Sequence, residues 1–86
     1  MYKNKALNGS NNLCGKKIKQ LRLELPTKTS QRKFAEILQI HGLDLDKNAI
    51  QRMEAGDRFI TDIELKTIAD VLNVSCDDLL NTDTTN

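Results

Sequence analysis

Residues 60–80 read ITDIELKTIADVLNVSCDDLL and contain two helix starts in close succession. In each, a hydroxyl residue is followed three positions later by a carboxylate, Thr61 by Glu64 and Ser75 by Asp78. Such a pair forms a capping box, in which each side chain accepts a hydrogen bond from the other residue's backbone N–H. Between the boxes, apolar residues recur at helical spacing, at Leu65, Ile68, Ala69 and Leu72. This pattern predicts one helix between the boxes and a short second helix that ends at about residue 80.

A third helix start lies upstream, in residues 43–57, LDLDKNAIQRMEAGD. Asp46 is a good N-cap, and Gly56 is a common helix stop. A helix between them would be apolar on one side, with Ala49, Ile50 and Met53. Its other side would carry the long polar side chains of Lys47, Asn48, Gln51 and Arg52. These residue types suit the base edges of duplex DNA, although the same composition is also common on a solvated helix face.

Two earlier helices complete the pattern. Residues 13–25 carry apolar side chains at helical spacing, which predicts a helix that Pro26 ends. The next helix runs from the N-cap Ser30 to His41, whose ring we expect to bond to late helix carbonyls, and Gly42 closes it.

The fold class follows from these helices and from the composition. Aromatic residues make up only 3% of the chain, so strands are poorly supported. We therefore expect an all-α fold, a five-helix domain over residues 12–81, with flexible segments at 1–11 and 82–86.

Charge is distributed unevenly along the 86 residues, although the net charge is only +1. Residues 1–33 hold nine lysines and arginines against one acid, whereas residues 34–86 hold four against eleven acids. The first part is therefore strongly basic and the second strongly acidic. A near-neutral total does not exclude a polyanion as partner, because the basic residues can share one face. The alternative is a solvated surface whose halves attract each other.

Several classes of protein find no support in the sequence. No apolar run suits a secretion signal or approaches the roughly 18 residues of a membrane span, so we expect no membrane association and a cytoplasmic location. Cys14 and Cys76 are then expected to be reduced thiols that act as small hydrophobic residues. With one histidine and no recognisable catalytic set or ligand cluster, we expect no enzyme activity, no metal and no cofactor.

Four segments, taken in their order and spacing, resemble the Cro- and phage-repressor-like helix-turn-helix family of XRE type. They are GKKIKQLR at 15–22, SQRKFAEIL at 30–38, NAIQRMEAGDR at 48–58 and LKTIADVLNVSCDDLL at 65–80. The resemblance covers about four-fifths of the chain. It implies a compact five-helix domain that binds double-stranded DNA, with the third helix in the major groove and the second beside it.

The resemblance also implies roles for individual residues. The base-reading candidates lie on the third helix and are Lys47, Asn48, Gln51 and Arg52. The candidates for phosphate contact lie mostly around the start of the second helix, where backbone N–H groups can hold an anion; they are Lys28, Ser30, Gln31, Arg32, Lys33 and Arg58. Arg22 and Glu54 match a structural pair that clamps the first helix to the end of the third.

The sequence departs from the family pattern in three places. The link LELPTKTS, residues 23–30, is longer than usual, and so is LQIHGLDLD, residues 38–46, between the second and third helices. We therefore expect an extended second helix and a loop in place of a tight turn. Asp57 replaces a usually basic residue, which would weaken a phosphate contact beside it.

Three functions are compatible with these features. The first is a sequence-specific transcriptional regulator, expected to be a repressor and to form a weak homodimer near the fifth helix. The second is a protein-binding module on the same fold, such as an antitoxin. The third is a single-stranded RNA binder, which is disfavoured because Tyr2, Phe34 and Phe59 are the only aromatic residues that could stack on bases.

Overall fold

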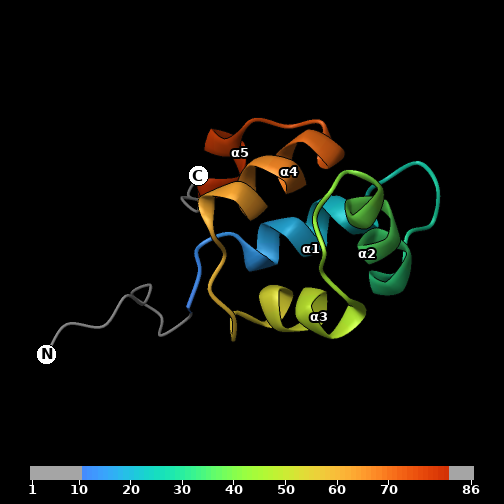
Figure 1. The fold of residues 1–86 in the computed structure, drawn as a ribbon. Coiled ribbons are helices and arrows are strands. Elements are labelled where there is room, and N and C mark those ends of the chain that lie inside the picture. Colours follow the sequence, from blue (N-terminus) through green and yellow to red (C-terminus); the bar gives the residue numbers. More distant parts are fainter. Residues whose placement is uncertain (1–10, 82–86) are drawn as a thin grey trace, which may run out of the picture.

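The computed structural model describes residues 11–81, which form five α-helices and no strands. They are α1 (Gly15–Leu23), α2 (Gln31–Ile40), α3 (Lys47–Ala55), α4 (Asp62–Leu72) and α5 (Cys76–Leu80). α1 lies between α3 on one side and α4 with α5 on the other, and α2 packs against α3 and α4 (Figure 1). The expected all-α class is confirmed. The segments expected to be flexible lie outside the described residues, except for residue 11.

The last three helices begin at the caps that the sequence predicts. The Asp46 carboxylate accepts the backbone N–H of Ala49 at 2.8 Å, which starts α3. Both hydrogen bonds of the capping box are present at the start of α4, and the same is true at the start of α5. α3 ends at Gly56, whose φ of 82° is a left-handed conformation that glycine adopts without steric cost. Local chemistry therefore sets the bounds of these helices.

α1 is shorter than the expected 13–25 at both ends. At its start, the Asn12 side chain accepts the N–H of Gly15 at 2.8 Å, which fixes the first helical residue two positions later than expected. At its end, Pro26 disfavours helical geometry for the residue before it, and the chain leaves the helix after Leu23.

The link between α2 and α3 is a loop of six residues, 41–46, as the long spacing predicts. α2 itself ends at Ile40, with His41 as its C-cap. The His41 Nδ1 lies 2.9 Å from the Ile37 carbonyl oxygen, so the ring bonds to a late helix carbonyl as expected.

Each helix contributes at least one fully buried side chain to a common core. These side chains are Ile18 of α1, Phe34 and Leu38 of α2, Ile50 and Met53 of α3, Ile68 of α4 and Leu79 of α5. Full burial of a side chain of this size stabilises a fold by roughly 1.5–3 kcal/mol. Because Ile50 and Met53 anchor the apolar side of α3, the opposite side of this helix must face outward.

Both cysteines are free thiols, Cys14 buried and Cys76 half-buried. Burial raises the pKa of the Cys14 thiol to about 11, so this group is neutral at physiological pH. No helix in residues 11–81 has the length and hydropathy needed to cross a membrane.

α1 and α3 make a close approach at Gly15, the first residue of α1. A Cβ atom at this position would overlap the carbonyl oxygen of Met53 and would lie 3.3 Å from that of Glu54. Both atoms belong to the backbone of α3, so they cannot move away as a flexible side chain could. Only glycine allows the two helices to lie this close.

We expect Gly15→Ala to lower the free energy of unfolding by about 1–3 kcal/mol, the range for overpacking a close contact. In an unhindered helix the same change is stabilising by up to about 1 kcal/mol, so the sign of the effect reports the close approach. Urea unfolding followed by circular dichroism measures it. The control is Lys16→Ala, at an exposed position of the same turn, with an expected change within about 0.5 kcal/mol. A stabilised Gly15→Ala variant would contradict the structure.

Candidate nucleic-acid interface

The outward face of α3 consists of the four side chains expected there. Lys47, Asn48, Gln51 and Arg52 are all exposed, whereas Ile50 and Met53 on the opposite side are buried. Among residues 11–81, none of the four exposed side chains forms a hydrogen bond or an ion pair. Their donors and acceptors are therefore available for a ligand.

A second group of cationic side chains surrounds the start of α2, the helix that packs against α3. Lys28, Arg32 and Lys33 are exposed and take part in none of the ion pairs within residues 11–81. Ser30 caps the helix, because its hydroxyl accepts the N–H of Lys33 at 3.1 Å. The helix dipole adds partial positive charge at this end, so the start of α2 is suited to an anion.

Gln31 is half-buried, and its side chain is already engaged. Its amide Nε2 donates to the Glu54 Oε1 at 3.0 Å. The side chain therefore points toward the end of α3. A phosphate contact from Gln31 would use its backbone N–H, or would require this bond to break.

Arg58 is held in a two-point ion pair in the link between α3 and α4. Its guanidinium donates to both Glu64 carboxylate oxygens, at 2.8 Å and 3.0 Å. The hydrogen bonds from Arg58 lower the pKa of the Glu64 carboxyl, so it remains charged at neutral pH and keeps its partner. Arg58 thus differs from Lys28, Arg32 and Lys33, which form no ion pair within residues 11–81.

A buried ion pair connects the site to the rest of the fold. The Arg22 Nε donates to the Glu54 Oε2 at 2.7 Å, and Nη2 donates to Oε1 at 3.0 Å. The third nitrogen, Nη1, donates to the Thr29 carbonyl oxygen at 2.8 Å. Both charged side chains are less than a tenth exposed. The pair, expected from the family resemblance, therefore connects α1, α3 and the link that precedes α2.

Two asparagines that were not expected at the site, Asn11 and Asn12, contact the end of α3 and the residues that directly follow it. Asn12 donates to the carbonyl oxygens of Met53 and Arg58, and Asn11 donates to that of Asp57. The only sequence signal was that Asn12 stands three residues before Gly15, whose backbone N–H donates to the Asn12 side chain. Its other partners lie more than 40 residues away, where no local pattern could reveal them.

Among residues 11–81, no group of three or more histidine, cysteine or acidic side chains is placed to hold a metal ion.

The candidate site is made of two surfaces on helices that pack together: the polar face of α3 and the cationic start of α2.

Comparison with known families agrees with this arrangement. A family model described as helix-turn-helix matches residues 18–79, which is well over half of the chain. No curated protein and no solved structure matches the chain significantly.

We expect Glu54→Gln to lower the free energy of unfolding by about 3–5 kcal/mol, because it leaves the buried Arg22 guanidinium without a counter-charge. The amide has nearly the same shape as the carboxylate, so lost packing contributes little. Urea unfolding at neutral pH measures the change.

The matched control is Asp70→Asn, which removes the carboxylate of the exposed pair between Lys66 and Asp70. Water screens this pair, so its loss should have little effect on stability. Equal effects of Glu54→Gln and Asp70→Asn would show that burial of the Arg22 pair has no special importance.

Proposed function

The chain belongs to the XRE-type helix-turn-helix family of DNA-binding regulators, and on this basis we propose that it is a sequence-specific transcriptional regulator. In this proposal α3 reads base edges in the major groove while the start of α2 contacts the phosphate backbone. The compartment we propose is the cytoplasm. We propose repression as the mode of action, because a domain bound to duplex DNA excludes other proteins from the same site.

One observation carries the proposal: four exposed side chains with unused donors and acceptors occupy the first two turns of α3. Asn48 and Gln51 can each make two hydrogen bonds to adenine, and Lys47 and Arg52 suit the acceptors of guanine. A face that served only to keep the protein in solution would not need to lie beside a helix start with three unpaired cations.

The phosphate contacts in this proposal come from Lys28, Arg32 and Lys33 and from the capped start of α2 at Ser30. Gln31 adds its backbone N–H to the same set, and Arg58 joins it only if phosphate competes successfully with Glu64. Each lysine or arginine that neutralises a phosphate releases counterions, so affinity for duplex DNA should fall steeply as salt is raised from about 50 to 200 mM.

Substitutions separate base reading from general attraction to DNA. The preferred duplex is first selected with the wild-type protein from random sequence. Asn48→Ala or Arg52→Ala should then cost roughly 1–3 kcal/mol on that duplex and relax the preference at one or two base pairs. Lys33→Ala should weaken preferred and scrambled duplexes about equally and reduce the salt slope by roughly one.

The measurement is the affinity of each variant for both duplexes at fixed salt. If Arg52→Ala and Lys33→Ala reduce both affinities by the same factor, α3 does not read sequence. A protein-binding module, such as an antitoxin, then becomes the better assignment.

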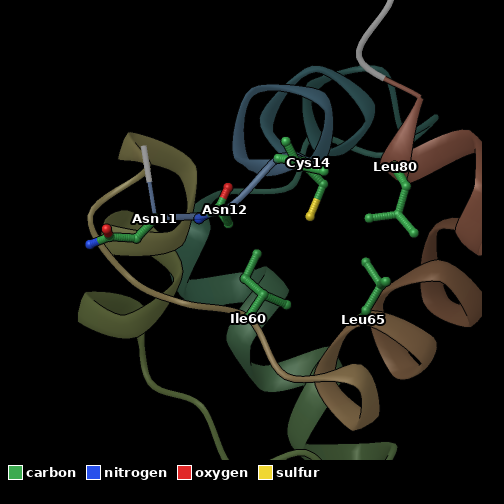
Figure 2. A pocket seen from close by; sticks show the side chains of 7 residues that line it. Asn11, Asn12, Cys14, Ile60, Leu65 and Leu80 are labelled. Carbon is green, nitrogen blue, oxygen red and sulfur yellow. The ribbon is translucent and has the colours of Figure 1, made fainter. Parts of the chain in front are cut away.

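We also propose a weak homodimer near α5, since helix-turn-helix proteins commonly read two half-sites about 34 Å apart. Two exposed leucines support a dimer contact near α5: Leu13 lies beside the start of α1, and Leu80 lies at the end of α5. They line one pocket of about 210 Å³ together with Cys14, Ile60 and Leu65 (Figure 2). A second copy that covers both leucines would remove apolar surface from water.

Leu80→Glu should shift the protein toward monomer, because dimerisation would then bury a charge. Sedimentation velocity over a range of concentrations, without and with the selected duplex, measures the shift. Ile63→Glu is the matched control, because it also adds one negative charge at an exposed apolar position, here on α4. A wild-type protein that is a strict monomer in both conditions excludes the dimer.

A further inference from the structure

The side-chain amide of Asn12 joins three segments of the chain. Its oxygen accepts the N–H of Gly15 at 2.8 Å, which starts α1. Its nitrogen donates to the Met53 carbonyl oxygen in the last turn of α3, at 3.1 Å, and to that of Arg58 in the following link, at 2.7 Å. The amide therefore uses both of its donors and holds α1, α3 and the link between α3 and α4 at one point.

Asn11 adds two hydrogen bonds to the same region. Its backbone N–H donates to the Gly56 carbonyl oxygen at 2.8 Å, and its side chain donates to that of Asp57 at 3.0 Å. In Figure 2 the two asparagines lie on one side of the pocket, and Leu65 and Leu80 lie on the other. Together they bond four carbonyl groups in six residues, 53–58.

The bond to Met53 and the Arg22–Glu54 pair act on the C-terminal half of α3, and the other three bonds hold the residues that directly follow it, 56–58. The N-terminal half, which carries Lys47 and Asn48, is held by its apolar side and by the Asp46 cap. A nine-residue helix is about 13 Å long, so a tilt of about 5° at one end moves the other by roughly 1 Å. Hydrogen bonds form over a range of only about 0.5 Å, so a displacement of this size decides whether a base edge is reached.

From this geometry we propose that Asn12 is a positioning residue for α3. Its amide sets the angle at which α3 leaves the core, and through that angle it sets how the reading face meets DNA. Asn12 itself touches no base. The role in reading rests on the proposed function, whereas the role in orienting α3 does not.

Two substitutions at Asn12 test this role. Asn12→Ala removes all three hydrogen bonds. Asn12→Asp keeps the acceptor for Gly15 and removes both donors, and its carboxylate then faces two carbonyl oxygens. Asn11→Ala removes only the bond to Asp57, since the other bond from Asn11 comes from its backbone, and it should give a smaller change in the same direction.

The first readout needs no DNA. Residual dipolar couplings of the α3 amides, compared with those of α4, report the orientation of α3 within the fold. They should change in both Asn12 variants. They should not change in Gln20→Ala, which removes an exposed amide of α1 whose partner is Glu24. Couplings in the Asn12 variants that match those of the wild type overturn the proposal.

The second readout is the preference for the selected duplex over a scrambled duplex of the same composition. In both Asn12 variants it should fall roughly tenfold, the equivalent of one good base contact, with the salt slope unchanged because no phosphate contact is lost. Ile68→Val is the control for simple destabilisation, because it trims the core on α4 far from the asparagines in the sequence.

The outcomes separate the two proposals. A preference that falls no further in the Asn12 variants than in Ile68→Val overturns the positioning role in reading. If the wild-type protein prefers no duplex, the proposed function fails, and the dipolar couplings alone decide whether Asn12 orients α3.

Discussion

The arrangement of the helices depends on one set of interactions, the hydrogen bonds and the ion pair that the buried Arg22 guanidinium makes. It lies at the end of α1 and donates to the Glu54 carboxylate of α3 and to the Thr29 carbonyl before α2. Gln31, the first residue of α2, donates to the same carboxylate. A planar, forked cation can satisfy these acceptors at once only in a narrow range of geometries. A buried pair adds little net stability over an apolar contact, but a buried charge without its partner is costly, so an arrangement of the helices that separates Arg22 from Glu54 is disfavoured.

A consequence of this arrangement is that α3 is held tightly at one end and left free on one side. Its last turn contacts Gly15 and Asn12, and its buried side contributes Ile50 and Met53 to the core. Its first turns present side chains with no partner among residues 11–81. A rigid scaffold with unused hydrogen-bonding groups on its surface is the form that a binding site requires, because little order is lost when a ligand binds.

The cations of the described residues fall into two groups, those paired with an acid and those without a partner acid. In the acidic part of the chain, Arg58 pairs with Glu64 and Lys66 pairs with Asp70, so two of its four cations are neutralised locally. A third, Arg52, lies on the exposed face of α3, the helix against which α2 packs. Among residues 11–81, the cations outside any ion pair therefore lie on α1, around the start of α2 and on the polar face of α3. The packing of α2 against α3 places the cations around the start of α2 and those of α3 on neighbouring helices, although they come from the basic and the acidic parts of the chain.

The sequence by itself determined the five helices and most of their ends. Caps such as Asp46, Thr61 and Ser75 bond to residues three positions away, and apolar spacing reports the buried side of each helix, so both signals are local. The polar face of α3 followed from the same spacing, and the Arg22–Glu54 pair was expected from the family resemblance. The tertiary structure alone decided that Asn12 ends up beside Met53, that Gln31 points toward Glu54, that Arg58 is occupied by Glu64, and that Gly15 cannot carry a side chain. All but the pairing of Arg58 depend on contacts between residues 23 to 41 positions apart, whose approach is set by how whole helices pack.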